Sequence, residues 1–174
     1  LSIFRSAPDT WAIDQLFPVM PIHRLDECPS ELGQFADLTC DSDGVLSRFI
    51  DGGAEKALLE LHALNDGEPY WIGMFLGGAY QEVMGNLHNL FGSTNAVHVR
   101  LNPRGNGYLL DHVVRGHTNA DVLEEMQHNP DLMLERLRQA SETAIQRGTL
   151  QIEDARLLMS HLKTSLDQTT YLEG

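Results

Sequence analysis

The spacing of apolar residues changes near Gly116, and this change constrains the fold more than any other feature. Before it, short apolar runs alternate with polar residues, as at 57–64 and 95–101, and turn residues separate the runs. After it, apolar residues recur at helical spacing. Alternation with frequent turns indicates an antiparallel sheet closed into a barrel or sandwich, and the later spacing indicates amphipathic helices. We therefore expect a mainly β fold with α, comprising a β-barrel domain at 1–117 and a helical segment at 118–174.

The strongest hairpin pattern joins two runs, 95–101 and 108–114, through a loop of sequence Asn-Pro-Arg-Gly-Asn-Gly. Glycine and asparagine supply the positive φ angles that tight hairpin turns need. Apolar runs at 45–50 and 70–75 predict further strands. Pro8-Asp9-Thr10-Trp11 predicts a short helix or turn.

Three helices are expected after the change in spacing. Thr118 or Asn119 can cap the first. Pro130 suits the first turn of the second, and Gly148 can end it in the left-handed conformation. The third should begin near residue 151 and carry one apolar face. These helices lack clustered polar chemistry, so we expect them to serve packing or assembly.

The charge and the two cysteines limit the partners and the location of the chain. It carries 12 basic and 25 acidic residues, a net charge of −13, so nucleic acid and anionic membranes should repel it. The sequence has no membrane-spanning apolar run and no signal-peptide pattern. Cys28 and Cys40 do not make a disulfide framework, which favours a reducing, cytoplasmic location. The chain starts on an apolar run without methionine, which favours a piece of a longer protein.

Cys40 lies in Leu-Thr-Cys-Asp-Ser-Asp-Gly, residues 38–44, beside Asp41 and Asp43. Nucleophilic thiols sit near cations, whereas neighbouring carboxylates favour the protonated thiol. Cys40 is therefore a candidate general acid. Asp41 and Asp43 can hold a cation, and a guanidinium suits a carboxylate through paired hydrogen bonds. The alternative is structural, with Cys40 buried at the end of a strand and the acidic residues forming a turn.

Paired glycines, Gly77 and Gly78, follow an apolar run and precede Tyr80. Glycines allow the backbone to approach a ligand closely, and the Tyr80 hydroxyl can reach a phosphate. The alternative is a bulge or sheet corner with a half-buried Tyr80. The eight histidines are dispersed and show no convincing metal-ligand spacing, so the residues themselves predict no metal site.

Taken together, several stretches resemble the C-terminal part of bacterial biosynthetic arginine decarboxylase, a member of the alanine-racemase-like group of pyridoxal phosphate decarboxylases. The matching stretches are 6–27, 38–44, 58–64, 69–99 and the terminal Thr-Thr-Tyr-Leu-Glu-Gly. The resemblance covers almost the whole chain. It implies conversion of L-arginine to agmatine and carbon dioxide on the route to polyamines. It also implies an N-terminal (β/α)₈ barrel that carries pyridoxal phosphate on a lysine, and a C-terminal β-barrel that completes the site.

The resemblance also implies roles for individual residues. The active site would lie at a dimer interface, where Cys40 would control protonation of the carbon that has lost carbon dioxide. Asp41 would face the distal cationic group of the substrate, and Tyr80 would contact the cofactor near its phosphate. Related ornithine decarboxylases resemble Cys-Asp-x-x-Asp at this place, whereas Asp43 comes only two residues after Asp41. The resemblance therefore implies no role for Asp43. The family is associated with magnesium, but no ligand set can be placed on this sequence.

The lysines limit what the chain can do alone. It has only Lys56 and Lys163, and neither lies in the cofactor-lysine motif of the family. We therefore expect the cofactor lysine outside this chain and no decarboxylation by the chain alone. The alternatives are a non-catalytic β-barrel module that dimerises with or regulates a full-length decarboxylase, and a structural domain in which Cys40 is only core. The resemblance implies a homodimer or higher homo-oligomer.

Overall fold

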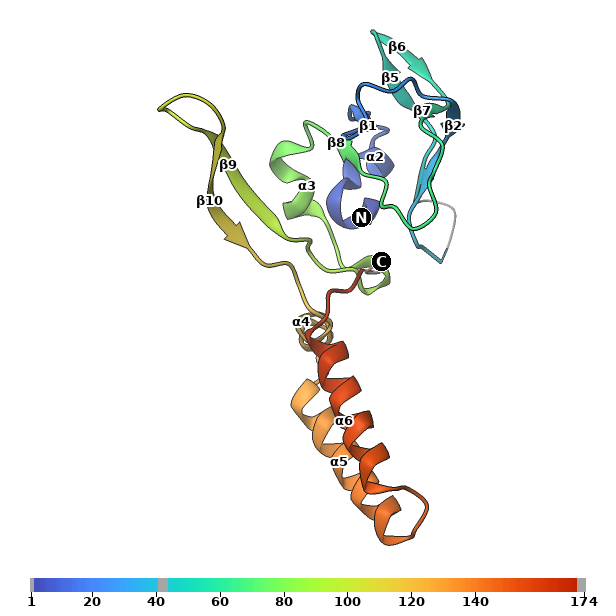
Figure 1. Cartoon of the computed structure of the whole chain (residues 1–174), viewed down its shortest axis with the longest axis vertical. Helices are drawn as coiled ribbons and strands as arrows, with labels where there is room; N and C mark the ends of the chain where they lie inside the picture. Colours follow the sequence, from blue (N-terminus) through green and yellow to red (C-terminus); the bar gives the residue numbers. More distant parts are fainter. Residues whose placement is uncertain (1, 41–43, 172–174) are drawn as a thin grey trace. The chain divides into compact units, whose positions relative to one another are not determined.

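The computed structural model describes residues 2–40 and 44–171, and the chain forms two compact units, Leu1–Phe91 and Gly92–Glu173. The first unit holds short strands and short helices, and the second holds a β-hairpin and the C-terminal helices (Figure 1). Antiparallel strands followed by C-terminal helices confirm the predicted fold class. The domain boundary predicted at residue 117 precedes the helices inside the second unit and stays a prediction.

The first unit is built from short antiparallel strand pairs. These are β1 (Val19–Pro21) with β8 (Ile72–Met74), β2 (Glu31–Gly33) with β7 (Leu59–Leu61), β3 (Phe35–Ala36) with β4 (Val45–Leu46), and β5 (Phe49–Asp51) with β6 (Ala54–Lys56). Its helices are α1 (Ile3–Ser6), α2 (Pro8–Ala12), α3 (Gly78–Met84) and the 3₁₀ turn η1 (His88–Leu90). The strands are short because glycine, proline and acidic residues interrupt the apolar runs.

The core of the first unit gathers apolar side chains from α1 and three strands. Ile3, Leu46, Phe49 and Leu59 are buried together, and half-buried Phe35 packs against them. The rings of Phe35 and Phe49 meet edge to face, with centroids 6.0 Å apart. The segment that precedes the first strand therefore helps to build the core beneath β3 and β4.

His62 shows how a buried histidine is satisfied in this unit. The Tyr70 hydroxyl accepts a hydrogen bond from the His62 backbone N–H at 2.9 Å and lies 2.7 Å from Nδ1 of the ring. The other ring nitrogen lies 3.2 Å from the carbonyl oxygen of Glu27. A buried polar side chain with its groups paired supports the structure, so His62, just after β7, is satisfied within the fold.

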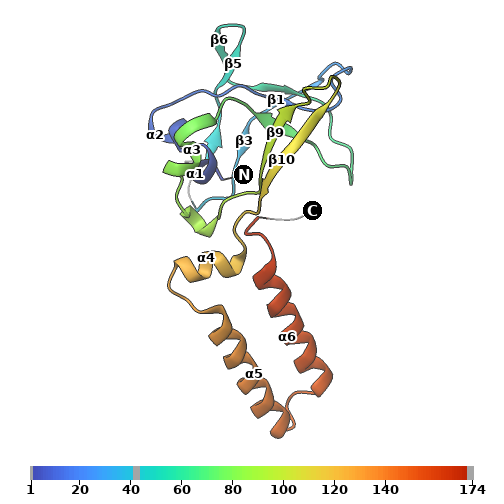
Figure 2. The same cartoon turned by 90° about the vertical axis from the view of Figure 1, so that its left-hand side faces the viewer.

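The second unit begins with the predicted hairpin, which is confirmed. Strands β9 (Ala96–Leu101) and β10 (Tyr108–Val114) pair antiparallel, with Leu101 opposite Tyr108 (Figure 2). Gly105 and Gly107 adopt positive φ angles of 113° and 97° in the connecting loop. The pairing shifts between Leu110 and His112, so Asp111 forms a bulge.

The predicted C-terminal helices are also confirmed. They are α4 (Asn119–Glu125), α5 (Pro130–Gln146) and α6 (Ile152–Asp167), and α5 and α6 run side by side (Figures 1 and 2). Gly148 turns the chain between them with a φ of 72°. In the part of the chain that the structure describes, no helix has both the length and the apolar character needed to cross a membrane.

A capping box fixes the start of α4. The Thr118 hydroxyl oxygen accepts a hydrogen bond from the backbone N–H of Asp121 at 3.1 Å. In return, Asp121 Oδ2 accepts from the Thr118 backbone N–H at 2.7 Å and from its hydroxyl at 2.8 Å. These bonds, the backbone one first, lower the pKa of Asp121. Helix α4 therefore begins where the sequence predicted, with Thr118 as its cap.

Candidate active site

Cys40 lies in the loop between β3 and β4, which the structure describes up to Cys40 and again from Gly44. Its thiol is free and exposed, as is that of Cys28. The interpretation of Cys40 as a buried core residue is therefore wrong, because the chain has already left β3 at Ala36. Asp41 and Asp43 lie outside the described residues. Cys40 is thus accessible to a ligand or to another subunit.

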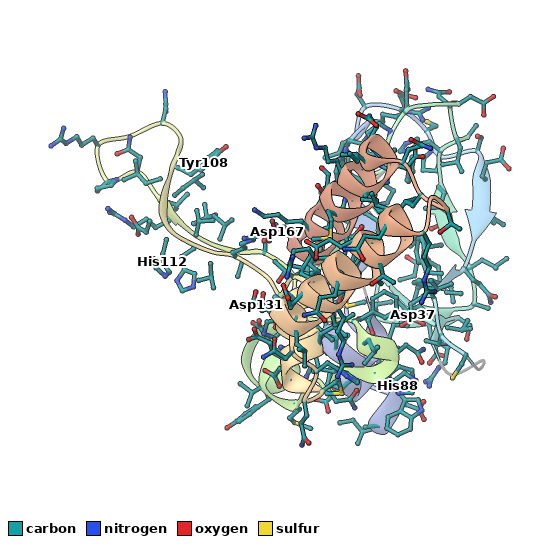
Figure 3. All side chains as sticks on the ribbon, turned by 90° about the horizontal axis from the view of Figure 1, so that it is seen from below. Asp37, His88, Tyr108, His112, Asp131 and Asp167 are labelled. Atoms are coloured by element: carbon teal, nitrogen blue, oxygen red, sulfur yellow. The ribbon has the colours of Figure 1, made fainter. Side chains whose placement is uncertain are left out.

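Asp37 and Gly44 close the base of this loop. The Asp37 backbone N–H donates a hydrogen bond to the Gly44 carbonyl oxygen at 2.8 Å, next to the paired residues Ala36 and Val45. The Asp37 carboxylate also accepts from the Ile3 backbone N–H at 2.7 Å; Figure 3 labels Asp37 in the first unit. Sequence reasoning missed Asp37 because its partner lies 34 residues away and no motif marks it.

Tyr80 lies in the first turn of α3, and its side chain is 70% exposed. It adopts a positive φ of 75°, and Leu76 just before the helix adopts 61°. Bulky residues rarely occupy this left-handed region, and such strained positions cluster at ligand sites. The alternative of a sheet corner with a half-buried tyrosine is therefore wrong, because the chain leaves β8 and turns into a helix here.

Open space borders the two glycines before Tyr80. A Cβ placed on Gly77 or Gly78 would meet no heavy atom within 4 Å. The backbone at these glycines, close in sequence to the exposed Tyr80, is therefore open to close approach by another group. Cys40 and Tyr80 lie on separate segments of the first unit, and within the described residues no hydrogen bond or ring contact joins them.

Comparison with known proteins finds a family model for the C-terminal helices and similar proteins for the whole chain. Residues 120–172 match the family described as arginine decarboxylase C-terminal helical extension. The chain is 75% identical over 173 residues to the biosynthetic arginine decarboxylase of Synechococcus sp. (strain RCC307). It is 73% identical over 174 residues to that of Prochlorococcus marinus (strain MIT 9313). The chain is therefore similar, over almost its whole length, to one stretch of the biosynthetic arginine decarboxylases.

The match extends over this whole chain but only part of each relative. The two alignments cover 99% and 100% of this chain, and 27% of each arginine decarboxylase. A crystal structure of the biosynthetic arginine decarboxylase of Campylobacter jejuni matches with a TM-score of 0.84 and 31% identity. That match covers 100% of this chain and 28% of the Campylobacter chain. The chain thus spans about a quarter of the length of the arginine decarboxylases that it matches.

Neither lysine has the surroundings that a cofactor lysine needs. Lys56 on β6 lies 3.7 Å from Asp51 and pairs with Glu60. The hydrogen bond to Glu60 is the largest of the effects that raise the pKa of Lys56, so its amine stays charged. A lysine that attacks a carbonyl must lose its proton, which requires the opposite shift. Lys163 is exposed on α6.

The structure gives no ligand set for the magnesium that the resemblance suggested. Across residues 2–40 and 44–171, no three His, Cys, Asp or Glu side chains gather closely enough to hold a metal ion.

Proposed function

We propose that this chain is the C-terminal part of a pyridoxal phosphate-dependent arginine decarboxylase, which converts L-arginine to agmatine and carbon dioxide. Identity of 75% and 73% to two biosynthetic arginine decarboxylases, over almost every residue of the chain, carries this proposal. The exposed Cys40 loop and the open glycines before Tyr80 support it, because both segments are free to meet a ligand.

Three residues of this chain would act in the reaction. The Cys40 thiol donates a proton to the carbon that loses carbon dioxide. The Asp41 carboxylate binds the guanidinium of arginine through paired hydrogen bonds. The Tyr80 hydroxyl donates a hydrogen bond to a phosphate oxygen of the cofactor. When bound, pyridoxal phosphate supplies the electron sink for the loss of carbon dioxide.

The cofactor lysine would lie outside this chain, and we propose that the chain alone is inactive. The charged, carboxylate-bound state of Lys56 and the exposed position of Lys163 support this division. Cys40, Asp41 and Tyr80 would then complete a site whose lysine belongs to another subunit. A cytoplasmic location suits the two free, exposed thiols, because oxidising compartments favour disulfides.

The partner that we propose is a second copy of the same protein, and the β9–β10 hairpin supports this. One face of the hairpin is wholly apolar and 46–84% exposed, comprising Val97, Val99, Leu101, Tyr108, Leu110 and Val113. A two-stranded ribbon is marginally stable in water by itself, and an apolar face of this kind marks an interaction surface. We call these six residues the hairpin face.

Charge favours an acidic partner for the hairpin. Residues 96–115 contain three arginines and one aspartate, whereas the rest of the chain holds nine basic and 24 acidic residues. The hairpin is therefore locally positive on a strongly negative chain, so a second copy offers it a surface of opposite charge. This complementarity supports a homodimer or a higher homo-oligomer.

The function of Cys40 is tested by its replacement in the full-length enzyme. We expect Cys40→Ala to lower the rate of decarboxylation and to raise the fraction of product protonated at the wrong carbon, on the cofactor. Cys28→Ala is the matched control, because it removes the other free, exposed thiol. Turnover and product fractions in Cys40→Ala equal to those of Cys28→Ala would rule out the acid role.

A further inference from the structure

We propose that Asp37 is a positioning residue for Cys40, which acts with Gly44 as the base of the loop that carries the thiol. The inference rests on the proposed function of Cys40 and extends it to residues without a motif. Asp37 would not touch the substrate. It would fix the point from which the loop leaves the sheet.

Asp37 makes one hydrogen bond through its backbone and one through its side chain. Its backbone N–H donates to the Gly44 carbonyl oxygen at 2.8 Å, which closes the loop across the end of the β3–β4 pair. Its side-chain Oδ2 accepts from the backbone N–H of Ile3 at 2.7 Å, which ties the loop to α1. Since Ile3 is buried in the core of the first unit, the loop base is anchored to a fixed part of the fold.

Position 44 requires a glycine, because a side chain there would overlap the Asp37 carboxylate. A Cβ at this position would overlap Oδ1 of Asp37, lie 2.5 Å from its Cγ, and lie 2.8 Å from Cγ2 of Thr39. Real side chains do not tolerate such separations, so any other residue at Gly44 must displace the Asp37 carboxylate or the residue just before Cys40. Asp37 and Gly44 therefore form one matched pair.

The two carboxylate oxygens of Asp37 have different surroundings, because Oδ2 accepts from the Ile3 N–H and Oδ1 does not. Asp37 borders an apolar cavity of about 260 Å³, together with Ile3, Phe35 and Leu46. Its Oδ1 is buried and has no hydrogen-bond partner in the described part of the chain. An unpaired buried carboxylate oxygen is unfavourable for folding. The bond of Oδ2 to the Ile3 N–H offsets part of this cost and holds the base of the Cys40 loop.

The short distance along the chain makes Cys40 sensitive to this base. Cys40 follows Asp37 by three residues, so a released base lets the thiol move over a range on the order of 10 Å. A misplacement of only ~1 Å at a reacting group can lower a rate by about two orders of magnitude. The two hydrogen bonds of Asp37 would therefore determine how often the Cys40 thiol lies within reach of the carbon that it protonates.

The test uses the full-length enzyme and measures kcat, KM for arginine and the fraction of misprotonated product. We expect Asp37→Ala to lower kcat about tenfold or more and to raise the misprotonated fraction. KM for arginine should rise as well, because Asp41 follows Cys40 in the same loop. Asp37→Asn should restore most of the loss, because its amide oxygen still accepts from the Ile3 N–H. Asp66→Ala, in an exposed loop, is the control.

A double variant shows whether Asp37 acts through Cys40. In a Cys40→Ala background, Asp37→Ala should cause no further change in kcat or in the misprotonated fraction, because there is no thiol left to position. Gly44→Ala displaces the base of the loop but keeps the Asp37 carboxylate, so it should also raise the misprotonated fraction. This variant tests the inference independently if Asp37→Ala does not fold.

The outcomes separate this inference from the function on which it rests. Parent-like product fractions in both Asp37→Ala and Gly44→Ala, with altered fractions in Cys40→Ala, would overturn the positioning role alone. A full, additive loss of kcat from Asp37→Ala in the Cys40→Ala background would also overturn it. Parent-like kinetics in Cys40→Ala itself would instead remove the proposed acid role of the thiol.

Discussion

The Cys40 thiol and the Asp41 carboxylate would act on opposite ends of one substrate, so their variants should separate binding from chemistry. We predict that Asp41→Ala weakens arginine binding about tenfold or more, because a charge-assisted pair with the guanidinium is lost. Pyridoxal phosphate binding should change little. Calorimetric titration with arginine and the cofactor absorbance of the same samples give both quantities. Unchanged arginine affinity would refute the role of Asp41.

Tyr80 offers a residue-scale test of the cofactor contact. Its side chain is 70% exposed, so Tyr80→Phe removes a hydroxyl without disturbing the core. We predict that the affinity of the apoenzyme for pyridoxal phosphate falls several-fold, as expected for one hydrogen bond, while the melting temperature of the apoenzyme stays the same. Reconstitution with increasing cofactor measures the affinity. Unchanged cofactor affinity in Tyr80→Phe would refute the contact.

At the scale of elements, the Thr118 capping box predicts a measurable stability. Thr118→Ala removes the hydroxyl that accepts from Asp121 N–H and donates to its carboxylate, so the free energy of unfolding should fall by about 1 kcal/mol. Thr118→Ser keeps the hydroxyl and is the matched control. Urea unfolding followed by circular dichroism measures both variants. Equal losses in the alanine and serine variants would show that the methyl group, and not the cap, is responsible.

The same box should respond to pH in a defined direction. The folded state lowers the pKa of Asp121, chiefly through the Thr118 backbone N–H. A lowered carboxyl pKa contributes stability that is present above the unfolded pKa of about 4 and is lost as the pH falls through the folded value. The difference in unfolding free energy between parent and Asp121→Asn, which removes the titrating carboxyl group, should therefore narrow below about pH 4. A constant difference from pH 7 to pH 3 would contradict this.

The elements that the sequence predicted are those with local causes. The β9–β10 hairpin follows from its Gly-Asn-Gly turn, and α4 and α5 follow from Thr118 and from Asn129 before a proline. Helix α3 was missed because Gly77 and Gly78 indicated only the end of a strand. The bond between Asp37 and Ile3 was missed because it joins residues far apart in the sequence. Long-range packing of this kind leaves no periodic pattern to find.

The candidate site shows the same division between local and long-range causes. The Cys40 segment and Tyr80 were found because they form short motifs, and the structure places both side chains at the surface. The exposure of Cys40 was not predictable, because it depends on where β3 ends. The base formed by Asp37 and Gly44 emerges only when two strands and α1 are packed together.

At the scale of the whole molecule, the hairpin face predicts how copies associate. Leu101 is 84% exposed on this face, so Leu101→Asp should raise the dimer dissociation constant about tenfold or more in the full-length enzyme. Leu109→Asp places the same charge on the opposite face of the hairpin and is the matched control. Sedimentation equilibrium measures both constants. Equal dissociation constants in the two variants would exclude the hairpin face from the interface.

Mixing two full-length enzymes, each impaired by one substitution, tests most directly whether this chain completes a site on another subunit. One carries Cys40→Ala, and the other lacks the cofactor lysine outside this chain. After dissociation and reassociation, arginine decarboxylation should recover to about a quarter of the parent rate, because half of the dimers are mixed and each has one intact site. Agmatine release measures the recovery. A mixture no more active than its two components would contradict the account.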